Sequence, residues 1–386
     1  MNPVGSISAD LANREAGLFA LLDRLVTVQS GSRNKQGVDR VADLIQSEFS
    51  DVHVTYQRVP QRQYGDHLVV RTPAVAPGKP QLLLIGHIDT VFPKDTSFTE
   101  YREDAKYAYG PGVIDMKGGL VTGIFALKAL DRADMLASVP LTFVFNSDEE
   151  VGSPGSGGLI REEARHSVFA FVLEAGGLNG EVVTGRKGNV SLEVTARGIA
   201  GHAAFAGPDK RSAILEMAHH TLALEALNDP GRGVSVNVGT IRGGIGPNTV
   251  PSEAVAGVDV RFSRPEDAET VQHRIQQILE KPMVPETETS HAIRTSRPAM
   301  PEEPNQPLFA AVKKTALRLG FDIEPEFRAG VSDANLVADE GVPVLDGLGP
   351  SGARDHSPDE YLLKDTFLPR TQLLAEAILD CWRQFG

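Results

Sequence analysis

Short apolar segments that end in polar residues are the feature that most constrains the fold of this chain. They are residues 67–72 (HLVVRT), 81–87 (QLLLIGH) and 141–150 (LTFVFNSDEE). Such runs are typical of buried strands, and residues 117–133, between the last two, have the apolar spacing of a helix. Strand, helix and strand in this order indicate an open α/β sheet, in which ligands bind beyond the carboxyl ends of the strands. We therefore expect a functional site where these strands end.

The middle of the chain has a different pattern. Between residues 187 and 297, strands alternate with helices at 212–227 and 266–280 in the order βαββαβ. This order predicts a ferredoxin-like α+β domain inserted into the larger α/β domain. Residues 298–386 then return to the α/β pattern, with helices at their beginning and end. We expect one domain formed by residues 1–186 and 298–386, and a second formed by residues 187–297.

Charge and cysteine content exclude several classes of function. The chain of 386 residues has 38 Lys and Arg against 51 Asp and Glu, a net charge of -13, which opposes binding to nucleic acid or to an anionic membrane surface. No apolar stretch is long enough to span a membrane, and residues 1–16 lack the pattern of a secretory signal, so we expect a cytoplasmic protein. Cys381 is the only cysteine, so any metal must be held by histidines and carboxylates.

Two motifs after the predicted strand at residues 81–87 carry candidate metal ligands. His87 and Asp89 lie two residues apart at a strand end, where the carboxylate can hold the second nitrogen of the imidazole. A local hydrogen bond at a strand end is the alternative for this pair. Asp115 follows an apolar trio and precedes a glycine pair that opens a helix, a position that also suits a simple helix N-cap.

Further carboxylates and a histidine follow the other apolar segments. Asp148, Glu149 and Glu150 run consecutively off a strand of nearly pure hydrophobic residues, where their mutual repulsion requires a cation. Glu174 also ends an apolar strand. His356 stands in a loop rich in Gly and polar residues, where a histidine is usually only exposed.

Taken together, these residues favour a site with two metal ions. The candidate ligands are His87, Asp115, Glu150, Glu174 and His356. Two zinc ions carry four positive charges, which three carboxylates and one bridging hydroxide neutralise, so the charges favour two ions over one. Glu149, next to a ligand, remains available as the general base.

At these motifs the chain resembles the two-zinc metallopeptidase family that includes bacterial glutamate carboxypeptidase, acetylornithine deacetylase, succinyl-diaminopimelate desuccinylase and the aminoacylases. The matching motifs span the whole chain in family order and are GHIDTV, GPGVIDMKGG, FNSDEEVGS, the strand end at Glu174, GIAGHAAFAGP, GGIGPNTVP, DVRF and HSPDEY. The chain resembles bacterial glutamate carboxypeptidase more closely than the deacetylases, because it has Glu174 where many relatives have Asp. The resemblance implies a mixed-sheet zinc-peptidase catalytic domain and an inserted lid domain that often forms a homodimer.

The resemblance also assigns a role to each site residue. It implies that His87 and Glu174 bind one zinc ion, that Glu150 and His356 bind the other, and that Asp115 bridges them. It further implies that Asp89 orients His87 and that Glu149 is the base. In the lid, it implies that His202 stabilises the oxyanion and that Asn248 holds substrate, with His202 acting in its own or in the partner subunit.

Arg297 falls where such enzymes carry an arginine for the α-carboxylate of the substrate, and a bidentate guanidinium suits that group. An exposed arginine at a strand end is the alternative. Three departures from the family pattern bear on specificity. The first is the sequence His202-Ala203-Ala204 in a lid loop that extends to Arg211. The second is Val331 in place of a glycine, and the third is Glu181 in place of a lysine.

We therefore expect a zinc-dependent hydrolase that cleaves an amide bond next to a free carboxylate, either a carboxypeptidase or an N-acyl-amino-acid amidohydrolase. Its substrate would be a small peptide or an N-acyl amino acid, and its cofactor two zinc ions per subunit, with cobalt or manganese as alternatives. A dipeptidase or an acetylornithine-type deacetylase is the nearest alternative. A non-catalytic binding subunit is a rival from another class, but a base beside a complete ligand set argues against it.

Overall fold

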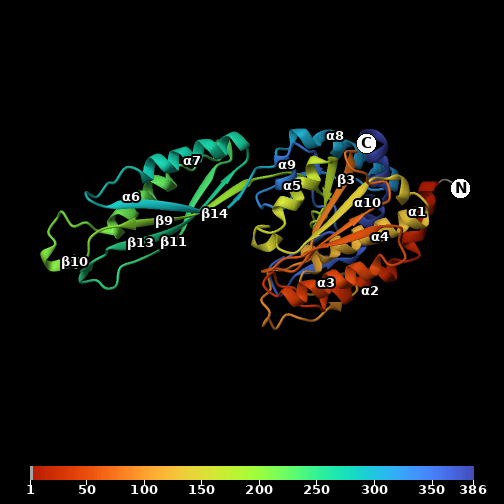
Figure 1. Cartoon of the computed structure of the whole chain (residues 1–386), viewed down its shortest axis with the longest axis horizontal. Helices are drawn as coiled ribbons and strands as arrows, with labels where there is room; N and C mark the ends of the chain where they lie inside the picture. Colours follow the sequence, from red (N-terminus) through yellow and green to blue (C-terminus); the bar gives the residue numbers. More distant parts are fainter. Residues whose placement is uncertain (1–2) are drawn as a thin grey trace. The chain divides into compact units, whose positions relative to one another are not determined.

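The computed structural model describes residues 3–386, and the chain divides into two compact units (Figure 1). Unit 1 comprises Met1–Gly185, of which residues 3–185 are described, together with Glu302–Phe327 and Ser332–Gly386. Unit 2 comprises Arg186–Pro301 and the short segment Arg328–Val331.

Unit 1 is built on a six-stranded mixed sheet. In spatial order its strands are β1 (Thr55–Val59), β2 (His67–Arg71), β6 (Leu141–Asn146), β3 (Gln81–His87), β7 (Ser167–Val172) and β16 (Val344–Leu345). The first two pairs are antiparallel, whereas β3 pairs in parallel with both β6 and β7, and β7 pairs in parallel with β16. Strands β3 and β6 are buried along their whole length, as their apolar composition predicts. The predicted mixed α/β sheet is confirmed.

Helices surround this sheet. They are α1 (Pro3–Ala12), α2 (Glu15–Val26), α3 (Lys35–Glu48), α4 (Gly118–Arg132), α5 (Gly157–Arg165), α8 (Gln306–Leu319), α9 (Ala334–Asp339) and α10 (Lys364–Phe385). Helix α10 packs against α1, α4 and α8, and α5 packs against α9. Helix α4 begins at the glycine pair, and a Cβ on Gly119 would lie 1.7 Å from the carbonyl oxygen of Leu173. Only glycine allows the start of α4 to approach the end of β7 so closely.

Short strands bring the C-terminal part of unit 1 beside its N-terminal part. A four-stranded sheet contains β17 (Gly352–Ala353), β18 (Tyr361–Leu363), β5 (Tyr107–Tyr109) and β4 (Arg102–Glu103), in this order. Strands β18 and β5 pair antiparallel, with Tyr361 opposite Tyr109. This pairing holds the loop of His356 next to the loop of Asp115. A further pair consists of β8 (Val182–Arg186) and β15 (Pro325–Arg328).

Unit 2 has the predicted βαββαβ order. Its elements are β9 (Gly188–Arg197), α6 (Ala213–Glu225), β11 (Ser235–Gly243), β13 (Glu253–Phe262), α7 (Pro265–Leu279) and β14 (Glu288–Arg297). The sheet has the order β11-β13-β9-β14 with every pair antiparallel. Along β13 buried residues alternate with more exposed ones, and the buried residues share one hydrophobic core with α6 and α7. A small extra pair, β10 (Gly201–His202) with β12 (Thr249–Val250), was not predicted.

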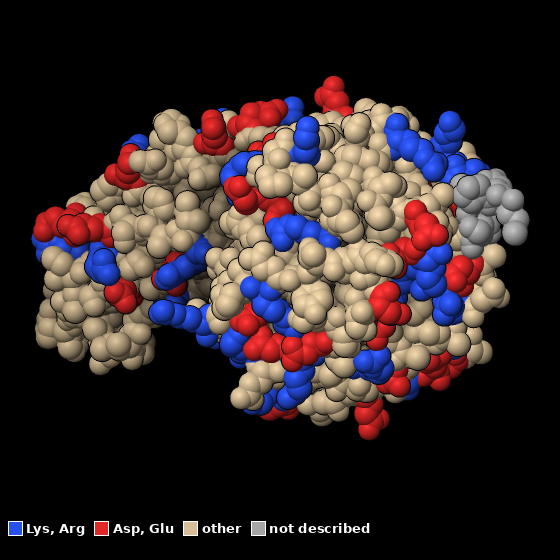
Figure 2. All heavy atoms as spheres, turned by 45° about the vertical axis from the view of Figure 1, so that its right-hand side comes forward, with Lys and Arg blue, Asp and Glu red and all other residues tan. Residues whose placement is uncertain are grey.

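Acidic and basic side chains are mixed on the face of the molecule that Figure 2 shows. Figure 2 shows Lys and Arg side chains interspersed with Asp and Glu over most of the visible face. That face therefore offers no continuous basic surface of the kind that a phosphate backbone binds. Within residues 3–386, no helix is long and apolar enough to cross a membrane.

Candidate metal centre

Three parallel strands explain why residues far apart in the sequence meet. His87 is the last residue of β3, and β3 lies between β6 and β7. Glu149 and Glu150 follow β6, and Glu174 follows β7. Because parallel strands end at the same edge of a sheet, these side chains come together there. The structure thus brings these predicted residues together at the edge where the strands end.

Asp115 lies between the two histidines. Its Oδ1 is 2.9 Å from Nε2 of His87, and its Oδ2 is 3.0 Å from Nε2 of His356. Asp115 and Met116 are joined by a cis peptide bond. Since each carboxylate oxygen faces a different histidine, Asp115 has the arrangement of a bridging ligand and not only that of a helix cap.

The surrounding carboxylates complete two ligand groups that share Asp115. One consists of His87, Asp115 and Glu174, and the other of Asp115, Glu150 and His356; in each, the ligand atoms lie within 4.8 Å of one another. Nε2 of His87 is 3.6 Å from Oε1 of Glu174, and Nε2 of His356 is 3.4 Å from Oε2 of Glu150. Imidazole nitrogens and carboxylate oxygens are ligands that zinc accepts.

The oxygens of Glu150 show that this donor set fits cations. Within the described residues Oε1 of Glu150 is buried and has no hydrogen-bond partner. A buried carboxylate oxygen without a donor is costly, because it has lost its water and gained nothing in return. A divalent cation at this point would satisfy it.

Electrostatics lead to the same conclusion. Burial, together with the charge of Asp115, raises the pKa of Glu150 to about 7, and burial raises the pKa of Glu174 well above its ordinary value. Hydrogen bonds to Asp115 and Glu150 raise the pKa of His356 to about 11. Burial opposes a charge on His87, but the carboxylates of Glu174 and Asp115 raise its pKa well above normal. Without metal, protons supply the positive charge that this cluster needs, and bound cations would displace them.

Asp89 supports both the ligands and the predicted base. It is fully buried, and its carboxylate accepts hydrogen bonds from Ser32 Oγ at 2.7 Å and from the backbone N–H groups of Glu149 and Glu150 at 3.2 and 3.3 Å. Nδ1 of His87 lies 3.0 Å from the backbone oxygen of Asp89 and 3.5 Å from its carboxylate. The backbone of Asp89 therefore makes the closer contact with His87, while its side chain organises the loop of the predicted base.

Sequence reasoning missed a second supporting carboxylate. Glu360 is fully buried and accepts hydrogen bonds from the backbone N–H groups of Gly112, Ile114 and Asp115 at 3.1, 2.9 and 3.1 Å. Burial raises its pKa to about 8. It lies within the HSPDEY motif, but beside Asp359 it has the pattern of an ordinary solvated pair.

A third buried carboxylate fixes the loop after Glu150. Asp333 accepts hydrogen bonds from Nδ2 of Asn146 and from Oγ of Ser153, both at 2.6 Å. Nearby Val331, which replaces a glycine of the family pattern, is not among the residues with positive φ. The substitution therefore costs no backbone strain.

His202 and Asn248 meet within unit 2. His202 is exposed on β10 opposite Thr249, and the N–H of Ala203 donates to the carbonyl of Asn248 at 2.9 Å. Nδ1 of His202 accepts a hydrogen bond from the N–H of Ala204 at 3.2 Å. In a neutral imidazole the other nitrogen then carries the proton, so Nε2 is a donor, as an oxyanion-stabilising group requires.

Arg297 is buried and Glu181 forms hydrogen bonds within its own loop. Arg297 ends β14 opposite Asn189 and is 3% exposed, so the alternative of an exposed strand-end arginine is wrong. Glu181 accepts hydrogen bonds from the backbone and side-chain nitrogens of Asn179 at 2.8 and 2.9 Å. Its carboxylate therefore contributes to the local structure of this loop.

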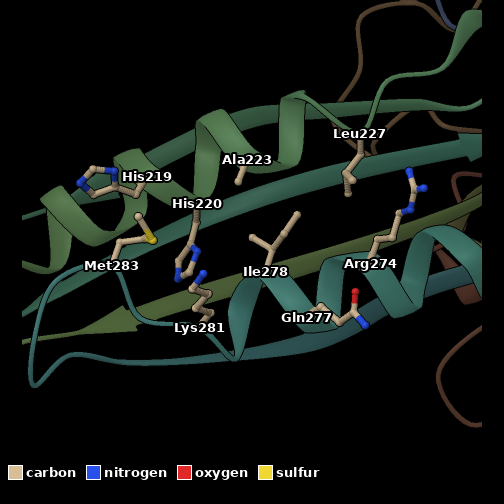
Figure 3. A pocket seen from close by; sticks show the side chains of 9 residues that line it. All are labelled: His219, His220, Ala223, Leu227, Arg274, Gln277, Ile278, Lys281 and Met283. Carbon is tan, nitrogen blue, oxygen red and sulfur yellow. The ribbon is translucent and has the colours of Figure 1, made fainter.

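Unit 2 has a cavity of its own, of about 360 Å³, between α6 and α7 (Figure 3). It is lined by His219, His220, Ala223, Leu227, Arg274, Gln277, Ile278, Lys281 and Met283. No Asp or Glu lines it, and none of its residues belongs to the two ligand groups. It therefore shares no residue with the metal centre.

Comparisons with known proteins agree with this site. The sequence profile of Peptidase family M20/M25/M40 matches residues 83–380. Carboxypeptidase G2 of Pseudomonas sp. (strain RS-16) is 27% identical, over 95% of this chain and 89% of the relative. Succinyl-diaminopimelate desuccinylase of Dechloromonas aromatica is 29% identical, over 70% of this chain and 74% of the relative.

Solved structures share the fold. Aminopeptidase PepT from Bacillus cereus ATCC 10987 aligns with a TM-score of 0.79 at 20% identity, covering 96% of this chain and 99% of its own. The M20 family metallo-carboxypeptidase Sso-CP2 from Sulfolobus solfataricus aligns with a TM-score of 0.74 at 16% identity, covering 95% and 98%. The resemblance seen in the sequence is confirmed: this chain is a metal-dependent hydrolase and belongs to Peptidase family M20/M25/M40.

Proposed function

We propose that this protein hydrolyses an amide bond adjacent to a free carboxylate, as a carboxypeptidase or an N-acyl-amino-acid amidohydrolase with two zinc ions per subunit. The observation that carries the proposal is the pair of ligand groups that share Asp115, with Glu149 next to one of the ligands. The name of the relative carboxypeptidase G2 supports the carboxypeptidase reaction.

In this proposal, His87 and Glu174 hold one cation, Glu150 and His356 hold the other, and Asp115 is shared. Bound zinc would polarise the scissile carbonyl and activate the attacking water near neutral pH. The cluster of three buried or half-buried carboxylates gives the site the negative charge that two divalent ions require.

Glu149 is the group that we assign to proton transfer. Its backbone N–H is fixed by the buried carboxylate of Asp89 at 3.2 Å, which positions the residue independently of its side chain. Glu149 accepts a proton from the attacking water and passes it to the departing amine. His202 donates from Nε2 to the developing oxyanion, Asn248 holds the substrate, and Arg297 binds the free carboxylate of the substrate.

We also propose a homodimer formed through unit 2. Strand β11 is an edge of the sheet. The N–H groups of Val236 and Val238 donate to the side chains of Asn228 and Glu225, so a second copy would pair with the part of the strand beyond Val238. Ile241 on this strand is 51% exposed, and Leu222 on α6, which packs against β11, is 73% exposed. A second copy would cover both. The cytoplasmic location stays a prediction, which cell fractionation tests.

Two alternatives remain within the family. A dipeptidase would require recognition of a free amino group, and an acetylornithine-type deacetylase would release a short acyl group. The relationship to a succinyl-diaminopimelate desuccinylase favours the second of these. A non-catalytic binding subunit would not require a general base such as Glu149 next to a metal ligand.

The test combines metal analysis with a substrate screen. Purified protein is loaded with zinc, cobalt or manganese, and its metal content is measured. It is then assayed against N-acyl amino acids, their carboxyl-amidated analogues, and dipeptides with free or acetylated amino groups. We expect two metal ions per chain and turnover that requires the free carboxylate. Equal turnover of the amidated analogues would contradict the proposed specificity, and metal-loaded protein without any amidase activity would contradict the function.

A further inference from the structure

A cavity of about 370 Å³ in unit 1 borders the metal centre. It is lined by Gly31, Ser32, Arg33, Asn34, Val91, Phe92, Pro93, Lys94, Glu150 and Val151. The presence of Glu150 in this wall connects the cavity directly to one of the two ligand groups. Val151 follows Glu150 in the same short helical turn, and the other lining residues come from the loop before α3 and from the loop after β3.

The walls of this cavity are held together by hydrogen bonds. The N–H of Thr90 donates to the carbonyl of Ser30 at 2.9 Å, and Nε2 of Gln29 donates to the carbonyl of Phe92 at 2.8 Å. A Cβ on Gly31 would lie 2.1 Å from that carbonyl oxygen, so the two loops touch backbone to backbone. Ser32 joins them to the metal centre through its bond to Asp89. The cavity is thus formed before any ligand enters.

Its charge is unusual for this acidic chain. Arg33 and Lys94 are exposed, and among residues 3–386 neither has a carboxylate within ion-pair distance. Neighbouring Lys35, in contrast, is paired with Asp66 at 2.5 Å and with Asp39 at 3.1 Å. Glu150 is the only acidic side chain in the lining, and it is assigned to metal. Two basic side chains without a carboxylate partner, Arg33 and Lys94, therefore line a cavity whose remaining wall is partly apolar.

We propose that this cavity binds the acyl half of the substrate and prefers an acyl group that ends in a carboxylate on a short apolar stem. This inference rests on the proposed function, which assigns the free carboxylate of the amino acid to Arg297 in unit 2. Because the amino-acid half of the substrate is assigned to unit 2, the acyl half is the part that a cavity in unit 1 would bind. Its terminal carboxylate binds Arg33 and Lys94, and its methylene groups pack against Val91, Phe92 and Val151.

The test uses a matched pair of substrates built on one amino acid that the enzyme accepts. One carries an N-succinyl group, and the other carries N-(4-methylpentanoyl), in which an isopropyl group replaces the carboxylate at nearly the same size. We expect kcat/KM of the wild type to favour the succinyl substrate by about 10- to 100-fold, which is the ratio that corresponds to the free energy of one charged hydrogen bond. In R33Q/K94Q this ratio should fall toward 1, while the exposed control K79Q keeps the ratio of the wild type.

A charge reversal makes the test independent of any loss of folding or metal. In R33E the preference should move toward an N-(4-aminobutanoyl) substrate of similar length, with metal content and melting temperature recorded for each variant. A wild type that does not distinguish the succinyl pair, or equal losses for both members in R33Q/K94Q, would overturn the cavity assignment and leave the proposed function standing. Absence of turnover for every amide tested would overturn the proposed function and the role of the cavity together.

Discussion

Glu149 and Glu150 are adjacent in the chain, yet the structure gives them different environments. Oε2 of Glu150 is 3.4 Å from Nε2 of His356, and the other oxygen of Glu150 is buried without a donor. The backbone N–H groups of both residues bind the same carboxylate, that of Asp89, so the peptide between them is fixed. A change confined to the side chain of Glu149 should therefore leave the ligand positions intact.

We accordingly predict that Glu149→Gln keeps its metal and loses turnover. The amide is nearly isosteric with the carboxylate but cannot accept the proton, and loss of a general base typically costs about 100- to 10,000-fold in kcat. Metal analysis and steady-state kinetics on the same preparation check this. The matched control is Asp115→Ala, which should lose metal as well as activity. Full metal with a nearly normal rate in Glu149→Gln would assign the base elsewhere.

The raised pKa values predict how metal-free protein responds to pH. The folded structure raises the pKa of Glu150 to about 7, of Glu360 to about 8 and of His356 to about 11. A group with a higher pKa in the folded state binds more protons there than when unfolded, so its contribution to stability is lost as pH rises through that pKa. We expect the melting temperature of the metal-free protein to fall from about pH 5 to about pH 8 as Glu150 and Glu360 lose their protons, and to fall further toward about pH 11 as His356 loses its proton. Zinc-loaded protein should show a smaller decline, since cations replace the protons of Glu150 and His356. The same dependence of melting temperature on pH with and without metal would contradict the prediction.

At the scale of elements, the sequence predicts the long strands and helices better than the short ones. An apolar run predicts strand β3, and apolar residues at helical spacing predict helix α4. The place of the candidate site can be predicted from them, because β3 ends between its two parallel neighbours. The sheet that contains β5 and β18 could not be predicted, because strands of three residues contain no periodicity. For the same reason the place of His356 beside Asp115 followed from the resemblance and not from local pattern.

The contact between α4 and the end of β7 can be tested with a glycine. In Gly119→Ala the new Cβ would meet the carbonyl of Leu173, which precedes the predicted ligand Glu174. Overpacking of this kind typically costs about 1 to 3 kcal/mol, and we expect a lower melting temperature together with weaker metal binding. The control is Gly158→Ala in α5, where nothing lies within 4 Å of the added Cβ. Equal melting temperatures for the two variants would contradict this account of the close approach.

At the scale of the whole molecule, the sequence indicated an inserted domain from a change in the order of elements. It could not show which residues of that domain serve the reaction, because their roles depend on contacts with substrate or with a second chain. His202 is an example. The structure shows it exposed beside Asn248 in unit 2, with Nδ1 accepting a hydrogen bond from the N–H of Ala204, which leaves Nε2 as the donor of a neutral imidazole.

Mixing two inactive variants tests whether His202 serves the partner subunit. His202→Ala and Glu149→Gln are each expected to lose about 100-fold or more in kcat with metal retained. If the lid of one subunit reaches the site of the other, mixed dimers contain one site with both groups intact, and activity should reappear after subunit exchange. Exchange is verified separately with labelled subunits. Proven exchange without recovery would place His202 in its own subunit or outside the reaction.

The buried carboxylate of Asp89 has a consequence for how this enzyme can change. It accepts hydrogen bonds from Ser32, in the wall of the proposed acyl cavity, and from the backbone N–H of Glu149, to which we assign the proton transfer. In our proposal one side chain therefore connects substrate choice to catalysis. A substitution at Ser32 that admits a new acyl group would also disturb that backbone. Arg33 and Lys94 are exposed and make no such connection. Laboratory selection for new acyl groups should therefore collect substitutions at positions 33 and 94 and leave position 32 unchanged.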